Sequence, residues 1–207
     1  MSDLLPIKKD IAAFLKSDHL AEITAKVLLK RLEENFLQPL FFSPSNFHLL
    51  GIIAQILMGE DTTEYNNKMA GSVDRRLYLK QGDGWRYDEM PPDEEAYVLG
   101  LKGIEQTALY LFKNSFQRLS FDEQNQVLTN IQKGTVPRKC WPSFSAKLFF
   151  EEILAEITEI YYSLPEIQLE IGYAGMADHH GWSKIKTGET EAVEMFVKKE
   201  FQQKKDA

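Results

Sequence analysis

Apolar residues recur every three to four positions along most of the chain, and this helical spacing constrains the fold more than any other feature. The strongest stretch follows Ser143 and Ser145, either of which can cap it. Its apolar residues share one side of the predicted helix: Leu148, Phe149, Ile153, Leu154, Ile157, Ile160 and Tyr161. Glutamates occupy the other sides and are most simply a solvated face. The pattern therefore predicts helices that bury one face against each other.

Capping and stop signals predict three helices in the first part of the chain. The first is expected over 18–36, with Asp18 as its N-cap. Ser45 can cap a second helix, which ends near Gly59. A third is expected over 63–79, and a glycine-rich loop follows it.

Similar signals predict the helices in the middle of the chain. Pro92 and Asp93 begin a long helix, because proline is tolerated at a helix start. Ser120 and Glu123 have the spacing of a capping box at the start of another helix. Gly134 is suited to end that helix in a left-handed conformation.

The C-terminal part is expected to be less regular. Residues 165–188 read as irregular structure with one short strand, because Ile167, Leu169 and Ile171 alternate. A final amphipathic helix is expected over 189–203; its apolar residues are Val193, Phe196, Val197 and Phe201.

These signals together predict an all-α fold. We expect a single-domain, irregular bundle of about seven to nine helices with glycine- and aromatic-rich loops. Along the chain it divides into a helical extension over 1–45, a main domain over 46–186, and a C-terminal helix over 187–207 that packs on that domain. The predicted core residues are Leu101, Ile104, Val127, Ile153, Leu154 and Ile157.

Composition excludes several classes of protein. The 207 residues carry a formal net charge of -7, which argues against nucleic-acid binding and against a polybasic membrane patch. The single cysteine, Cys140, rules out an internal disulfide and a cysteine-cluster zinc site. No stretch approaches the roughly 20 apolar residues of a membrane span. The start lacks a signal-peptide layout, so we expect a cytoplasmic chain unless a partner carries it to the periplasm.

Catalytic motifs are missing from the sequence. It contains no dinucleotide fingerprint, Walker A loop, H-E-x-x-H or G-x-S-x-G motif. The one notable polar cluster is Asp178, His179 and His180. Adjacent histidines point in different directions on most backbones and rarely share one metal. We therefore expect a polar loop rather than a metal or catalytic site.

Two loops combine glycines with large aromatic residues. They are G-D-G-W-R-Y at 82–87 and G-Y-A-G-M-A-D-H-H-G-W at 172–182. Trp, Tyr and Arg dominate the hot spots of protein interfaces. The same rings can instead fill gaps between helices, because aromatic residues dominate cores as well as interfaces. Composition alone does not separate these two interpretations.

Several short segments occur together in a specific order and spacing. They are F-H-L-L-G-I-I-A-Q-I-L-M-G-E-D at 47–61, S-V-D-R-R-L at 72–77, G-D-G-W-R-Y at 82–87, A-Y-V-L-G-L-K-G-I-E at 96–105, F-Q-R-L-S-F-D-E-Q-N-Q-V-L at 116–128, T-E-I-Y-Y-S-L-P at 158–165, I-G-Y-A-G-M-A-D at 171–178 and G-W at 181–182. Over roughly residues 46–186 the chain thereby resembles the gluconate 2-dehydrogenase subunit 3 family.

This resemblance implies a non-catalytic accessory subunit. Family members assist the maturation of an FAD-dependent large subunit of the glucose–methanol–choline type, which oxidises a sugar or polyol. The flavin and the catalytic base belong to that large subunit, so no cofactor is expected in this chain, and a cytochrome subunit often accepts the electrons. The residues expected to contact the large subunit are Arg75, Trp85, Arg86, Tyr87, Tyr173 and Trp182.

The chain departs from the family pattern at its start. Many members supply a twin-arginine export signal, whereas residues 1–45 here read as a charged helical extension. Two other interpretations stay open. One is a small enzyme that uses the loop around Asp178, His179 and His180. The other is a helical adaptor whose partner is unrelated to redox chemistry.

Overall fold

The fold is all-α, as the helical spacing predicts. The computed structural model describes residues 11, 13–33, 38–60, 62–82, 89–173, 175, 178–179 and 186–189. This part of the chain contains the α-helices α2 to α8, further helical residues at 11 and 13–15, two 3-10 turns and no strand. None of the helices described is both long and apolar enough to cross a membrane.

The chain forms two compact units. The larger is Asn35–Tyr161, and the smaller combines Met1–Glu34 with Tyr162–Ala207. The smaller unit therefore draws on both ends of the chain, which the sequence does not reveal. Each unit is described by itself below.

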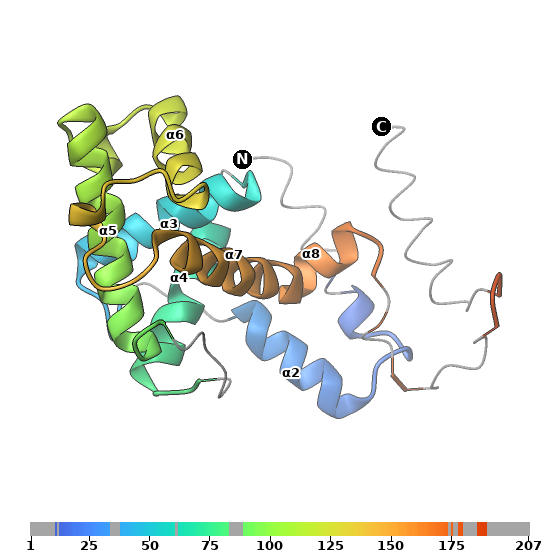
Figure 1. The fold of residues 1–207 in the computed structure, drawn as a ribbon. Coiled ribbons are helices and arrows are strands. Elements are labelled where there is room, and N and C mark those ends of the chain that lie inside the picture. Colours follow the sequence, from blue (N-terminus) through green and yellow to red (C-terminus); the bar gives the residue numbers. More distant parts are fainter. Residues whose placement is uncertain are drawn as a thin grey trace. The chain divides into compact units, whose positions relative to one another are not determined.

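The larger unit contains most of the helices. They are α3 (Pro44–Met58), α4 (Thr63–Tyr78), α5 (Asp93–Phe112), α6 (Phe121–Gln132) and α7 (Ala146–Ser163, whose last two residues belong to the smaller unit), with 3-10 turns η1 (Phe116–Arg118) and η2 (Arg138–Cys140). α3 packs against α4, and α5 packs against α6 (Figure 1).

The start of α3 differs from the prediction. Ser43, not Ser45, is the N-cap, and its Oγ accepts the N–H of Asn46 at 3.2 Å. Pro44 takes the first helical position, where its fixed φ is favourable and its missing N–H costs nothing. The helix ends as predicted at Gly59, which has a left-handed φ of 66°.

The other predicted helix boundaries of this unit are confirmed. α5 begins at Asp93 directly after Pro92. Ser120 and Glu123 form the complete capping box of α6, and Gly134 follows that helix with a φ of 67°. Of the two serines before α7, Ser145 accepts the N–H of Leu148 at 3.4 Å.

The predicted core residues lie in one hydrophobic core. Five of the six predicted residues are almost completely buried there: Leu101, Ile104, Val127, Ile153 and Ile157. Leu154 is half-buried and packs against the same core. The prediction from helical spacing is therefore confirmed.

Glycines in α5 allow aromatic rings to approach the helix backbone. A Cβ atom built at Gly100 would lie 2.3 Å from Cζ of Phe149, and one at Gly103 would lie 2.7 Å from Cε2 of Trp141. The indole N–H of Trp141 donates to Oγ1 of Thr107 at 3.0 Å, which fixes the ring. The glycines of the segment 96–105 thus serve the packing between α5 and the aromatic side chains.

We expect Gly100→Ala to destabilise the larger unit by about 2 kcal/mol, because the new methyl group would overlap the buried ring of Phe149. Gly51→Ala in α3 is the matched control. A Cβ atom there would meet only the carbonyl oxygen of Asn66, at 3.9 Å. Alanine favours helix over glycine by up to about 1 kcal/mol, so the control is expected to be neutral or stabilising. Urea unfolding checks this, and equal midpoints for the two variants would contradict the packing argument.

The smaller unit contains α2 (Glu22–Glu33) packed against α8 (Pro165–Glu170). Phe14, Leu20 and Leu28 form its core, with Leu169 packed against them.

The smaller unit differs from the sequence-based predictions at two points. α2 begins at Glu22, so Asp18 is not its cap. Residues 165–170 form a helix rather than a strand, and Pro165 takes the first helical position, where proline is favoured. The predicted helix over 189–203 lies outside the described residues, apart from Glu189.

Candidate functional site

The loop between α4 and α5 carries the segment G-D-G-W-R-Y. Gln81 and Gly82 lie at its start, and Glu89 to Pro92 lead into α5. Trp85, Arg86 and Tyr87 lie outside the described residues, so their assignment to a partner surface stays a prediction. The described part of the structure shows how the two ends of this loop are fixed.

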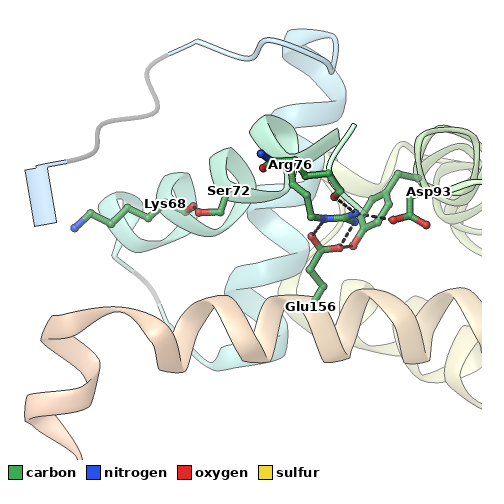
Figure 2. Close-up of polar contacts among 7 residues, drawn as sticks. Lys68, Ser72, Arg76, Asp93 and Glu156 are labelled. Carbon is green, nitrogen blue, oxygen red and sulfur yellow. Dashed lines mark hydrogen bonds and ion pairs between the residues drawn. The ribbon is translucent and has the colours of Figure 1, made fainter. Parts of the chain in front are cut away.

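Arg76 joins the two ends of the loop. Its Nη1 donates to the carbonyl oxygen of Gln81 at 3.1 Å and to Oδ2 of Asp93 at 2.6 Å. Gln81 precedes the aromatic residues and Asp93 follows them. One guanidinium nitrogen therefore connects the start of the loop with the first residue of α5 (Figure 2).

The same guanidinium binds α7. Nε and Nη2 of Arg76 donate to Oε1 and Oε2 of Glu156 at 2.6 and 2.8 Å, a bidentate pair with well-defined geometry. The hydroxyl of Tyr97, on α5, donates to Oε2 of the same carboxylate. Figure 2 shows Arg76 and Glu156 pointing toward one another from α4 and α7. We call Arg76, Asp93, Tyr97 and Glu156 the Arg76 cluster.

The Arg76 cluster has a fixed pattern of charge and protonation. Burial disfavours the charged guanidinium, but the bonds and charge of Glu156, and then Asp93, outweigh it and raise the pKa of Arg76. Burial, with the nearby charge of Glu156, raises the pKa of Tyr97 well above its ordinary value. Arg76 therefore stays charged and Tyr97 stays a hydrogen-bond donor at neutral pH. This arrangement suits a rigid support better than proton transfer.

Asp74, in the same segment S-V-D-R-R-L, holds the chain before α3 in place. Both carboxylate oxygens of Asp74 accept backbone N–H groups of the segment before α3, from Leu40 at 2.6 Å, Phe41 at 3.1 Å and Phe42 at 2.8 Å. Arg75, the residue predicted to contact a partner, is half-buried on α4. Its role in binding stays a prediction, whereas Arg76 is the residue that sequence reasoning passed over.

The second aromatic loop begins with a well-defined turn after α8. Gly172 has a φ of 76°, and the N–H of Tyr173 returns to the carbonyl oxygen of Gln168 at 2.8 Å. The ring of Tyr173 lies over Gly175, where a Cβ atom would be 2.2 Å from its Cζ. Tyr173 is half exposed, and Trp182 lies outside the described residues. The two are thus not shown to share a surface.

Asp178 stabilises the start of α2. Oδ1 accepts the N–H of Ala21 at 2.8 Å, and Oδ2 accepts the hydroxyl of Thr24 at 2.5 Å. The N–H of His179 donates to the carbonyl oxygen of His19 at 3.1 Å. Asp178 therefore caps a helix far away in the sequence. Among the described residues, no three His, Cys, Asp or Glu side chains gather as metal ligands; His180 lies outside them.

This cap is expected to depend on pH. The bond from Thr24, followed by the bond from Ala21, lowers the pKa of Asp178 below its ordinary value of 3.8. Because the folded pKa is the lower one, the stabilisation is complete above about pH 4 and is lost as the pH falls through the folded pKa. Amide-exchange protection of the first turn of α2 should decline over that range.

Asp178→Ala should lower that protection already at neutral pH and remove its pH dependence. Asp18→Asn is the matched control, since it changes the residue that the sequence favoured as the cap. If the control lost protection while Asp178→Ala kept it, the assignment of the cap would be wrong.

Comparison with known proteins shows which family the chain belongs to. A family model for gluconate 2-dehydrogenase subunit 3 matches residues 44–185, more than half of the chain. The chain belongs to the gluconate 2-dehydrogenase subunit 3 family. No curated protein and no solved structure gives a significant match. Among the described residues of the segments that carry the resemblance, Ser120 and Glu123 form a capping box, Gly100 and Gly103 allow close packing, and Arg76 and Tyr97 belong to the Arg76 cluster.

Proposed function

We propose that this chain is a non-catalytic small subunit that binds an FAD-dependent sugar or alcohol dehydrogenase and assists its maturation. In the proposed complex the FAD and the catalytic base belong to a large subunit of the glucose–methanol–choline type. A cytochrome subunit accepts the electrons in complexes that contain one. The family's description as a dehydrogenase subunit supports a role inside such a complex.

The observation that carries this proposal is the Arg76 cluster. It connects the two ends of the loop that contains Trp85, Arg86 and Tyr87. An interface loop gains affinity when its ends are ordered before binding, because less entropy is lost in the complex. Trp, Arg and Tyr are the residue types that contribute most to such interfaces. A rigid connection between the two ends of the loop is therefore suited to protein recognition.

The alternative of an enzyme centred on Asp178 has less support. Both oxygens of this carboxylate accept hydrogen bonds that fix α2, and the pKa of the group is lowered. A general acid or base works best with a pKa near the operating pH, which requires the opposite shift for a carboxylate. The geometry thus favours a structural role for this residue.

The test is purification of the chain alone and in complex. The isolated chain should lack flavin absorbance and should not reduce a redox dye with gluconate, glucose, fructose or polyols. A tagged copy in its native cell should co-purify with a large flavoprotein that carries the FAD and the activity. Stoichiometric flavin or turnover in the repurified isolated chain would overturn the proposal. Co-purification of a protein without redox chemistry would instead identify an adaptor.

A further inference from the structure

The smaller unit carries an exposed apolar groove. It has a volume of about 340 Å³ and lies between α2 and the chain that follows α8; its apolar lining comes from Ile23, Val27, Leu28 and Tyr173. Ile23 is 70% exposed, Tyr173 is 52% exposed and Val27 is 45% exposed. Arg31 and Gln168 add polar groups to the lining.

This exposure is unusual for a short amphipathic helix. Leu28 of α2 is buried in the small core with Leu20, while Ile23 and Val27 line the groove with little cover from the described residues. A cluster of exposed apolar side chains with polar groups beside it marks an interaction site. Ile23 and Val27 lie four residues apart, so they form one ridge along the helix.

We propose that residues 189–203 of the same chain occupy this groove as an amphipathic helix that runs antiparallel to α2. This segment has apolar residues at helical spacing: Val193, Phe196, Val197 and Phe201. They would form a single stripe about two turns long, matched to the ridge of Ile23 and Val27. A short helix of this kind is marginal in water alone and gains its stability by burying such a stripe.

The chain path before this segment supports the proposal. Asp178 is fixed at the start of α2, and the N–H of Glu189 donates to the carbonyl oxygen of Lys186 at 3.0 Å. Gly188 within this turn has a left-handed φ of 84°, so the chain changes direction just before the segment. Residues 179–188 can span roughly 35 Å when extended. That exceeds the length of α2, which is about 18 Å.

Charge favours the antiparallel direction. The last turn of α2 carries Lys30 and Arg31 beside a single acidic residue, Glu33, and its first turn carries Glu22. The first half of the segment carries only acidic charges, at Glu189, Glu191 and Glu194, whereas its second half carries Lys198 and Lys199 beside Glu200 and is net positive. An antiparallel arrangement brings the glutamates to the basic end of α2 and the lysines to Glu22. A parallel arrangement would bring like charges together at both ends, which is unfavourable.

Hydrogen exchange of the full chain tests this inference. Amides of 189–203 should be protected in the unchanged protein, and Val27→Asp should lower their protection at least tenfold. Ile171→Asp is the matched control, since Ile171 is exposed in the same unit but does not line the groove. It should leave the protection unchanged. A melting curve of each variant verifies that the fold itself is intact.

The outcomes separate this inference from its alternatives. No protection of 189–203 in the unchanged chain, or protection that survives Val27→Asp, would overturn it. If Val27→Asp instead lowers the hydrogen-exchange protection of residues 1–10, the groove is occupied by the N-terminal segment. Protection that appears only at high protein concentration would assign it to a second copy of the chain.

As a second readout, the double variant Ile23→Cys/Phe201→Cys should form an intramolecular disulfide at least tenfold faster than Ile23→Cys/Val193→Cys. The reverse order would contradict the antiparallel direction.

Discussion

Replacing Ile157 by Asp should unfold the larger unit, with a loss of at least about 4 kcal/mol. Ile157 is fully buried on α7 within the main core. The change removes an apolar side chain and puts an unpaired carboxylate into a fully buried apolar site, and this combination belongs to the most damaging class of substitutions.

Ala155→Asp is the control for that experiment. Ala155 lies on the same helix but is exposed, so the same change should alter stability by no more than about 0.5 kcal/mol. Helical circular dichroism during urea unfolding measures both variants. Similar midpoints for Ile157→Asp and the unchanged chain would show that α7 does not contribute its apolar face to the core.

Arg76→Met is expected to destabilise the larger unit by about 2 to 3 kcal/mol. Breaking a buried ion pair costs about 3–5 kcal/mol because the remaining charge stays buried without its partner. The side chain of Arg76 is 24% exposed and that of Glu156 is 13% exposed, so water reduces this cost. The variant also removes the bonds to Gln81 and Asp93 at the two ends of the aromatic loop.

Two further variants separate charge from geometry in the Arg76 cluster. Arg76→Lys keeps the charge but lacks the planar fork, so it should recover only part of the lost stability. Arg76→Met should cost less in a Glu156→Gln background, because no buried carboxylate is then left without its cation. Equal costs in both backgrounds, measured by urea unfolding, would mean that the pair is not coupled.

The parts of the fold that depend on neighbouring residues could be predicted from the sequence. The capping box at Ser120, the stop at Gly59 and the buried stripe of α7 are local patterns, and the structure confirms them. The segment 165–170 shows the limit of such patterns. Three alternating apolar residues favoured a strand, but so short a run does not distinguish the two periods, and Pro165 was the stronger signal.

Long-range contacts could not be predicted in this way. Asp178 caps α2 across 157 positions of sequence, and no local feature links the two. Asp18 was the better candidate by distance along the chain, yet the helix begins four residues later. The spacing of the apolar residues did contain a signal for Arg76. Arg76 lies three residues after Val73 and just before Leu77, both of which are buried. This position is at the edge of the buried face of α4, where the side chain can reach α5 and α7.

We propose that the loop whose two ends are joined by the Arg76 cluster binds a dehydrogenase large subunit. The direct measurement is the affinity of Trp85→Ala for the co-expressed large subunit, beside the melting curve of the free variant. Truncation of a hot-spot residue costs about 2 kcal/mol or more, roughly thirtyfold in affinity, and leaves the free subunit stable.

Trp141→Ala is the matched control for this measurement. Trp141 is buried in the main core and bonded to Thr107, so its truncation should cost about 3–5 kcal/mol of stability. We predict that Trp85→Ala loses affinity with an almost unchanged melting curve, whereas Trp141→Ala loses stability. Undiminished affinity for both Trp85→Ala and Arg86→Ala, with normal melting, would contradict the claim and exclude this loop from the interface.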